Sequence, residues 1–155
     1  MTRHSAGIVV FRVGATNVDV LLGHMGGPFW QRKDDSAWSI PKGEFTDDED
    51  PLDAARREFQ EELGCAVPGG ELFDLGEVAQ SGRKSVRAWA VEGDLDVAAV
   101  TSNTFDLEWP PKSGRIQQFP EIDRAAWFDL PTAHTKIVRG QRELLDRLVA
   151  LLSER

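Results

Sequence analysis

Two apolar, β-branched runs near the N-terminal end of the chain predict a pair of neighbouring strands. The first run is Gly7–Val13 and the second is Val18–Met25, and the residues Gly14–Asn17 between them are typical of a turn. Gly-Gly-Pro at positions 26–28 ends the second run, because glycine and proline interrupt strands. The chain is therefore expected to begin with two paired strands.

Shorter apolar segments predict further strands and a final helix. We expect strands near Trp38–Ile40, Leu72–Val78, Val86–Val91 and Ala126–Asp129. The last helix is expected over Arg139–Ser153, where leucines recur at helical spacing, at Leu144, Leu145, Leu148 and Leu151.

The clearest helix of the sequence is Pro51–Leu63. Asp50 is a favourable N-cap, proline is favoured at the first helical position, and Asp53 stands where it can reach back toward the cap. Gly64 follows the last helical residue, where glycine commonly ends a helix. Both ends of this helix are thus specified by the local sequence.

The order of these elements predicts an α+β or α/β/α sandwich. A chain of 155 residues fits one domain, and we expect a single domain over residues 1–155. The stretch Gly93–Asp123 has no clear period and is interpreted as a long loop. Loops of this length in compact domains are usually functional or disordered.

Three glutamates, Glu58, Glu61 and Glu62, lie on one edge of the predicted helix, beside its apolar face. A solvated surface is the simpler explanation, but like charges at these spacings cost about 0.2–0.5 kcal/mol per pair. Negative charge in the last turn also opposes the helix dipole. Carboxylates are the oxygen ligands that Mg²⁺ and Mn²⁺ prefer, so this edge predicts a divalent-cation site.

The net charge of −8 narrows the classes of partner. Such a chain repels nucleic acid and acidic membrane surfaces, so no DNA and no membrane partner is expected. One cysteine, Cys65, excludes an internal disulfide, and no apolar run is long enough to span a bilayer. We expect a cytoplasmic protein, as a monomer or homodimer, and an anionic substrate would need divalent cations to neutralise the acidic site.

The segment from Gly43 to Cys65 matches a known pattern. Its fixed residues are Gly43, Glu49, Arg57-Glu58, Glu61-Glu62 and Gly64, and the segment resembles the Nudix box, G-x5-E-x7-R-E-U-x-E-E-x-G-U, with U apolar. Seven fixed positions agree in identity and spacing, which chance would produce about once in 10⁸–10⁹ starting sites. Cys65 departs from the usual aliphatic residue, and we expect it to pack as a small apolar side chain.

The resemblance implies a Nudix fold, with a mixed sheet between helices and a loop–helix–loop at the box. It also implies a metal-dependent hydrolase of diphosphate linkages. Glu58, Glu61 and Glu62, with the carbonyl of Gly43, would bind Mg²⁺ or Mn²⁺. The ions would bridge phosphate oxygens and lower the pKa of a bound water.

Two further roles follow from the same resemblance. Arg57 would orient the carboxylates, through Glu49, rather than contact substrate. The general base would be Glu61 or Glu58, because members of the family use different bases. The box leaves that choice open.

The context of the box bears on the substrate. The sequence Trp38-Ser39-Ile40-Pro41-Lys42-Gly43, with Glu49-Asp50, resembles the W-x-x-P-K-G…E-D pattern of asymmetric diadenosine tetraphosphate hydrolases. It implies a dinucleoside polyphosphate or a nucleoside triphosphate as substrate, with Lys42 either on a phosphate or simply at the surface. Alternatives are an RNA 5′-end pyrophosphohydrolase and a non-catalytic module that senses nucleotides.

Aromatic and basic residues in the loops are candidates for substrate binding. Phe29, Trp30 and Trp109 each offer a ring on which a base could stack, or pack in the interior. Lys112 and Arg115, in the long loop, could hold additional phosphates, or be ordinary surface charge.

A further acidic ligand or base is expected outside the box, because members similar to this chain place a Glu shortly before the aromatic residue of the last strand. Glu121 lies six residues before Trp127 and fits that place. Asp123 and Glu108 have the same chemistry and are rivals. A solvated loop carboxylate is the alternative for each.

Overall fold

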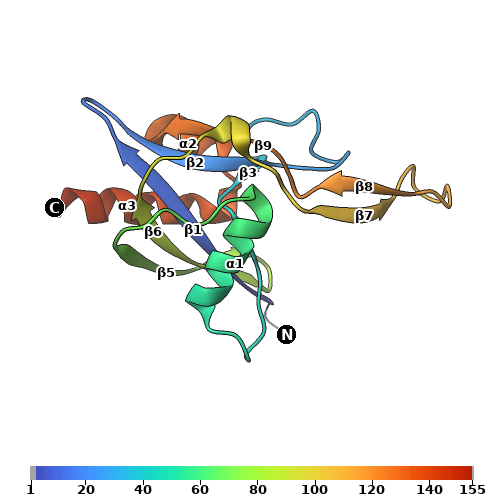
Figure 1. The fold of residues 1–155 in the computed structure, drawn as a ribbon, viewed down its shortest axis with the longest axis horizontal. Helices are drawn as coiled ribbons and strands as arrows, with labels where there is room; N and C mark the ends of the chain where they lie inside the picture. The colour runs from blue at the N-terminus through green and yellow to red at the C-terminus, as the bar shows by residue number, and fades with distance from the viewer. Residues whose placement is uncertain (1–2, 155) are drawn as a thin grey trace.

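The computed structural model describes residues 3–154 and contains a seven-stranded mixed sheet, a separate two-stranded hairpin and three α-helices (Figure 1). None of the helices among these residues is long and apolar enough to cross a membrane. The sheet strands are β1 (Arg3–Val13), β2 (Val18–Met25), β3 (Trp38–Ser39), β4 (Lys42–Glu44), β5 (Leu72–Ser81), β6 (Lys84–Glu92) and β9 (Ile122–Asp129). The hairpin strands are β7 (Thr104–Glu108) and β8 (Ile116–Pro120), and the helices are α1 (Pro51–Leu63), α2 (Leu130–Lys136) and α3 (Arg142–Ser153).

The centre of the sheet is the pairing of β1 with β6. These two strands are parallel, and the other pairings of the sheet are antiparallel. The strand order is β3-β2-β1-β6-β5, with β4 added to β1 and β9 added to β2. The parallel register sets Arg3 opposite Lys84, which places two cations from distant parts of the chain at one end of the sheet.

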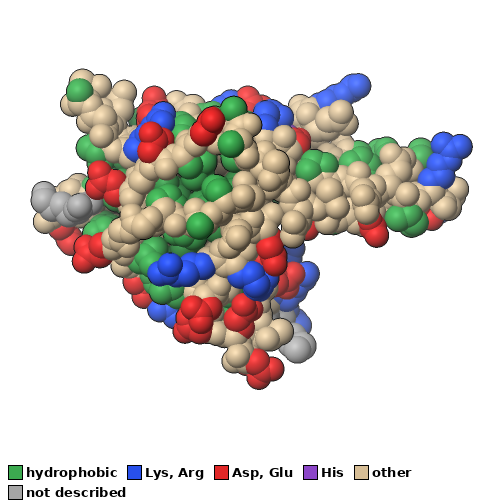
Figure 2. Space-filling model, viewed as in Figure 1, with side chains coloured by type: hydrophobic (Ala, Val, Ile, Leu, Met, Phe, Trp, Pro, Cys, Tyr) green, Lys and Arg blue, Asp and Glu red, His purple; other side chains and the backbone are tan. Residues whose placement is uncertain are grey.

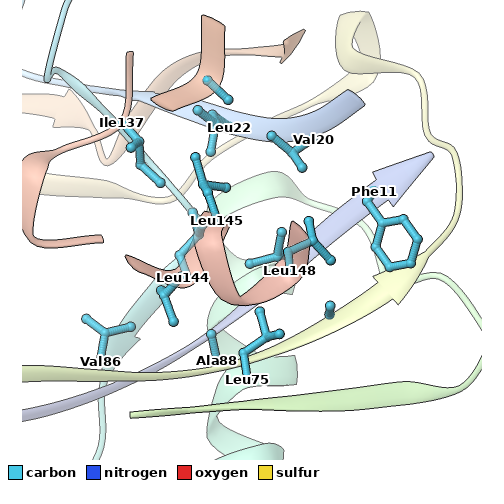
Figure 3. Close-up of a cluster of buried hydrophobic side chains, with 14 of the residues drawn as sticks. Phe11, Val20, Leu22, Leu75, Val86, Ala88, Ile137, Leu144, Leu145 and Leu148 are labelled. Carbon is cyan, nitrogen blue, oxygen red and sulfur yellow. The ribbon is translucent and has the colours of Figure 1, made fainter. Parts of the chain in front are cut away.

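Helices cover both faces of the sheet, so the predicted sandwich is confirmed. Alternate residues of β1 enter two separate cores, because successive side chains of a strand point to opposite faces. One core packs the leucines of α3 against the sheet (Figure 3); the other packs α1 against the opposite face. On β1, Val9 and Phe11 belong to the first core, and Ala6, Ile8 and Val10 to the second.

The helix α1 has the predicted bounds and the predicted caps. The Asp50 carboxylate accepts a hydrogen bond from the Asp53 N–H at 3.1 Å. Gly64 adopts φ 75°, and its N–H donates to the Gln60 carbonyl at 2.8 Å. Only glycine takes this left-handed conformation without strain, so the helix ends at that residue.

The interpretation of Gly93–Asp123 as a long loop was wrong. This stretch holds a 3₁₀ turn at Val97–Ala99 and the hairpin β7–β8, which projects from the body as an arm with basic side chains at its far end (Figures 1 and 2). Phe105 and Leu107 alternate with exposed polar residues, which is a strand pattern over a short range.

The C-terminal part of the chain differs from the prediction in two smaller respects, both at the start of a helix. The strand β9 runs into the separate short helix α2, capped by the Asp129 carboxylate on the Thr132 N–H at 2.8 Å. The final helix begins at Arg142, because Arg139–Gln141 forms a 3₁₀ turn.

Candidate active site

The contact between β4 and α1 fixes the acidic edge of the helix. Residue 43 pairs with Ala6 on β1, and a Cβ built on Gly43 would lie 2.0 Å from Cδ of Glu58. Such a contact is impossible, so only glycine lets the Glu58 carboxylate approach this backbone. The Lys42 N–H donates to Oε1 of Glu62 at 3.2 Å. Two of the three box glutamates are therefore held against β4.

A cleft of about 400 Å³ opens between this edge and the ends of β1, β5 and β6. Its lining brings together the four predicted carboxylates and two cations that were not predicted, Arg3 and Lys84. Arg3 pairs with Glu44, with Nη2 and Oε2 at 2.6 Å. The carboxylates in the lining are Glu44, which pairs with Arg3, and the predicted Glu58, Glu61, Glu62 and Glu121, beside Gly43 and Lys42.

Glu121 reaches the cleft from the junction of β8 and β9. Its N–H donates to the Asn103 carbonyl at 2.8 Å, and its carbonyl accepts from the Gly26 N–H at 3.0 Å. A Cβ on Gly26 would lie 1.8 Å from the Pro120 carbonyl oxygen, so this approach also needs glycine. The backbone around Glu121 is thus held from two sides.

The two rivals of Glu121 lie elsewhere. Asp123 accepts from Nδ1 of the buried His24 at 2.9 Å, and Nε2 of that ring faces the Lys33 carbonyl at 2.6 Å. Glu108 accepts from the N–H groups of Lys112 and Gly114, and so holds the turn of the hairpin. Neither rival is among the residues that line the cleft.

Arg57 links the carboxylates of the box. It donates Nε and Nη2 to the two oxygens of Glu49, both at 2.9 Å. Its Nη1 donates to Glu58 at 2.7 Å and lies 3.3 Å from Glu61. The hydrogen bond to Glu49 raises the pKa of the guanidinium, and the same bond lowers the pKa of Glu49. Planar, bidentate contacts of this kind orient carboxylates.

Burial destabilises the charge of two box glutamates. It raises the pKa of Glu62 to about 8, against the opposing effect of Lys42, and the nearby Glu121 and Glu58 add to the rise. Burial also raises the pKa of Glu58, although Arg57 opposes it. Acidic groups gathered in this way are stable as anions only beside additional positive charge.

The residues predicted to bind substrate are distributed over two regions. Lys42 lines the cleft, and Trp30 lines a neighbouring pocket. Phe29 instead packs edge-on against Trp109, with ring centroids 5.3 Å apart. Lys112 and Arg115 lie in the distal turn of the hairpin, outside the lining of both pockets.

Several lining residues were not predicted. Arg3 and Lys84 meet only through the parallel pairing of strands 81 positions apart, for which the sequence carries no local signal. Phe105 lines the pocket beside Trp30, and its alternation with Leu107 was the available signal. For Cys65, burial raises the pKa of the thiol, which agrees with a packing role.

The site and the fold together define a class of protein. A carboxylate-lined helix edge, ordered by an arginine and set against the end of a mixed sheet between helices, is the arrangement of a Nudix hydrolase of phosphoanhydride bonds. Residues 1–148 match the family model described as the NUDIX domain, so the chain belongs to this family.

Two proteins of known name and one solved structure illustrate what the chain is similar to. The RNA pyrophosphohydrolase of Gluconacetobacter diazotrophicus is 32% identical over 135 residues, which is 80% of this chain and 73% of that protein. An octanoyltransferase of Myxococcus xanthus is 32% identical over 114 residues, 73% of this chain but only 29% of that protein. The structure of a C. elegans Ap4A hydrolase binary complex covers 99% of this chain and 100% of its own, at a TM-score of 0.63 and 23% identity, and so shares the fold.

Nudix proteins generally need a divalent cation, and the residues here fit one. Glu58, Glu61, Glu62 and Glu121 offer hard oxygen donors at one cleft, and the raised pKa of Glu62 shows that its charge would be stabilised by a cation beside it. Among residues 3–154, no three acidic, histidine or cysteine side chains already converge as a cation cage. Arg57 instead contacts Glu58 and Glu61.

The raised pKa of Glu62 predicts a pH-dependent effect on stability. A folded-state pKa above the unfolded value favours folding at low pH, and this contribution is lost as pH rises through about 8. Without metal, Glu62→Gln should therefore be more stable than the wild type at pH 9, by roughly 5 kcal/mol, and within about 1 kcal/mol of it at pH 5. Urea unfolding in EDTA at both pH values measures the difference. A Glu62→Gln advantage that does not grow with pH would contradict the argument.

Proposed function

We propose that the protein hydrolyses dinucleoside polyphosphates, with diadenosine tetraphosphate as the substrate to test first. One observation carries the proposal: Lys42 lines both the cleft and the pocket of Trp30, between the carboxylates and an aromatic wall. Lys84 also lines the cleft. A chain of several phosphates needs both cations along its path, since each phosphate brings negative charge.

The residues of the chain supply the remaining parts of the reaction. Bound Mg²⁺ or Mn²⁺ would be held by Glu58, Glu61 and Glu62, and would neutralise the phosphates and acidify water. A carboxylate oxygen of Glu61, Glu58 or Glu121 takes the proton of the attacking water. Water oxygen bonds to phosphorus as the bridging P–O bond breaks, and the leaving phosphate oxygen keeps the electron pair. Arg57 keeps the carboxylates in orientation through its contact with Glu49.

Product analysis tests the choice of substrate. With Mg²⁺, diadenosine tetraphosphate should be cleaved asymmetrically into ATP and AMP, because Trp38-Ser39-Ile40-Pro41-Lys42-Gly43 resembles the asymmetric hydrolases. Chromatography separates this outcome from two molecules of ADP. Glu61→Gln, purified in the same way, controls for contaminating hydrolases. No cleavage of this compound, with rapid turnover of a nucleoside diphosphate sugar, would refute the choice.

Removal of pyrophosphate from RNA 5′ ends is the second candidate. The 32% identical relative named RNA pyrophosphohydrolase favours it. The net charge of −8 opposes it, because long-range repulsion weakens RNA binding. A non-catalytic module is disfavoured by the intact set of four carboxylates. A 5′-triphosphorylated oligonucleotide belongs in the same assay, and its faster turnover would favour the RNA activity.

A further inference from the structure

A second pocket adjoins the cleft on the side of β2 and β9. It has a volume of about 340 Å³ and shares three residues with the cleft, Lys42, Glu62 and Glu121. The rest of its lining is largely apolar or aromatic, in contrast to the charged cleft. These residues include Met25, Trp30, Phe105 and Ile122.

Phe105 reaches this pocket because the base of the hairpin is attached to the site itself. Asn103, one residue before β7, donates its N–H to the Glu61 carbonyl at 2.9 Å and accepts from the Glu121 N–H at 2.8 Å. A Cβ on Gly27 would lie 3.0 Å from the Phe105 ring, and Gly27 has φ 93°. The loop after β2 therefore packs directly against Phe105, and glycine permits the approach.

The ring of Trp30 also lines this pocket. Lys33 Nζ lies 5.2 Å from the centroid of this ring, which places a cation against it. Trp30 also packs against the core beneath α3, so the indole is held in place. Two aromatic side chains from separate elements thus line one pocket, beside the groups that would act on a phosphate chain.

We propose that Phe105, on the hairpin, and Trp30, in the loop after β2, form a subsite for a nucleobase, which the Nudix box does not supply. Planar bases bind by stacking on aromatic rings, and pockets of a few hundred Å³ with apolar walls and few polar groups are suited to such ligands. The phosphate chain of the bound nucleotide then runs past Lys42 to Glu62 and Glu121. This inference rests on the proposed function, because it assigns the base of that substrate.

Binding of AMP and of ribose 5-phosphate separates the base from the phosphate. Isothermal titration calorimetry with Mg²⁺ should show AMP binding at least about 10-fold more tightly than ribose 5-phosphate to the wild type. Phe105→Ala and Phe105→Leu should each reduce AMP affinity by about 10-fold and leave ribose 5-phosphate affinity as it is. Leucine keeps an apolar side chain at this position of the hairpin, so a loss of AMP affinity in Phe105→Leu is attributed to the missing aromatic ring. Phe105→Trp should retain the preference.

Leu107→Ala is the matched control. Leu107 lies two residues further along β7 and lines neither the cleft nor the pocket, so its variant should bind AMP as the wild type does. Equal affinity of the wild type for the two ligands would overturn the subsite, as would a preference that survives in both Phe105→Leu and Trp30→Ala. If AMP is preferred through Phe105 but diadenosine tetraphosphate is not cleaved, the subsite stands and the proposed substrate is wrong.

Discussion

Replacing Glu61 or Glu62 by glutamine should lower kcat by at least about 10²-fold at saturating Mg²⁺, because each change removes a charged oxygen donor from the cleft. Both side chains lie on the acidic edge of α1 and outside its buried face, which consists of Ala54, Ala55, Phe59 and Leu63. The folded structure should therefore survive the substitutions.

Initial rates, measured beside thermal unfolding of the same samples, test this expectation. Glu143→Gln on α3 is a suitable control, since Glu143 is an exposed glutamate that pairs with Arg147 far along the sequence from the box. Rates near the wild-type value in both the Glu61 and the Glu62 variants would rule out the metal-ligand assignment. A large fall in the melting temperature of these variants would instead show that the glutamates on this edge of α1 are needed for folding.

Glu121→Gln is the second substitution with a large expected effect. As a ligand or general base, Glu121 should contribute about 10²–10⁴-fold to kcat, and its variant should need more Mg²⁺ or Mn²⁺ for half-maximal activity. Its backbone is held by Asn103 and Gly26 whatever the side chain is, so stability should change little.

The two rival carboxylates are controls for this experiment. Asp123→Asn weakens the contact with the buried His24 and should lower the melting temperature while the metal dependence remains. Glu108→Gln should affect only the turn of the hairpin. Wild-type rate and metal dependence in Glu121→Gln would refute the role of Glu121 as ligand or base. A loss of kcat confined to Asp123→Asn would assign that role to Asp123 instead.

The parts of the site that could be predicted are those determined by local sequence. The bounds of α1 follow from Asp50 and Gly64, and the spacing of its glutamates places them on one edge whatever the rest of the fold is. The residues of the Nudix box are contiguous in the sequence, so the motif can be recognised without knowing how the strands of the sheet pair.

The remaining parts depend on contacts between distant segments. Arg3 and Lys84 meet through strand pairing, and Phe105 reaches the pocket because the base of the hairpin is attached to Glu61 and Glu121 through Asn103. The long loop was misassigned because strands of five residues give a weak periodic signal beside prolines and polar turns. Phe29 shows the same limit, since its partner, Trp109, lies 80 positions away.

The arm formed by β7 and β8 places one residue of the pocket, Phe105, on a different element from the carboxylates of the box. The three box glutamates that line the cleft come from one helix, α1, whereas Phe105 comes from a two-stranded ribbon whose far end lies outside the lining of the cleft and of the neighbouring pocket. If Phe105 holds the base of the substrate, substitutions on β7 and β8 beyond Asn103 should alter which molecules bind and leave the carboxylates of α1 in place. A designed library confined to that ribbon would then vary selectivity while the residues of the Nudix box stay the same.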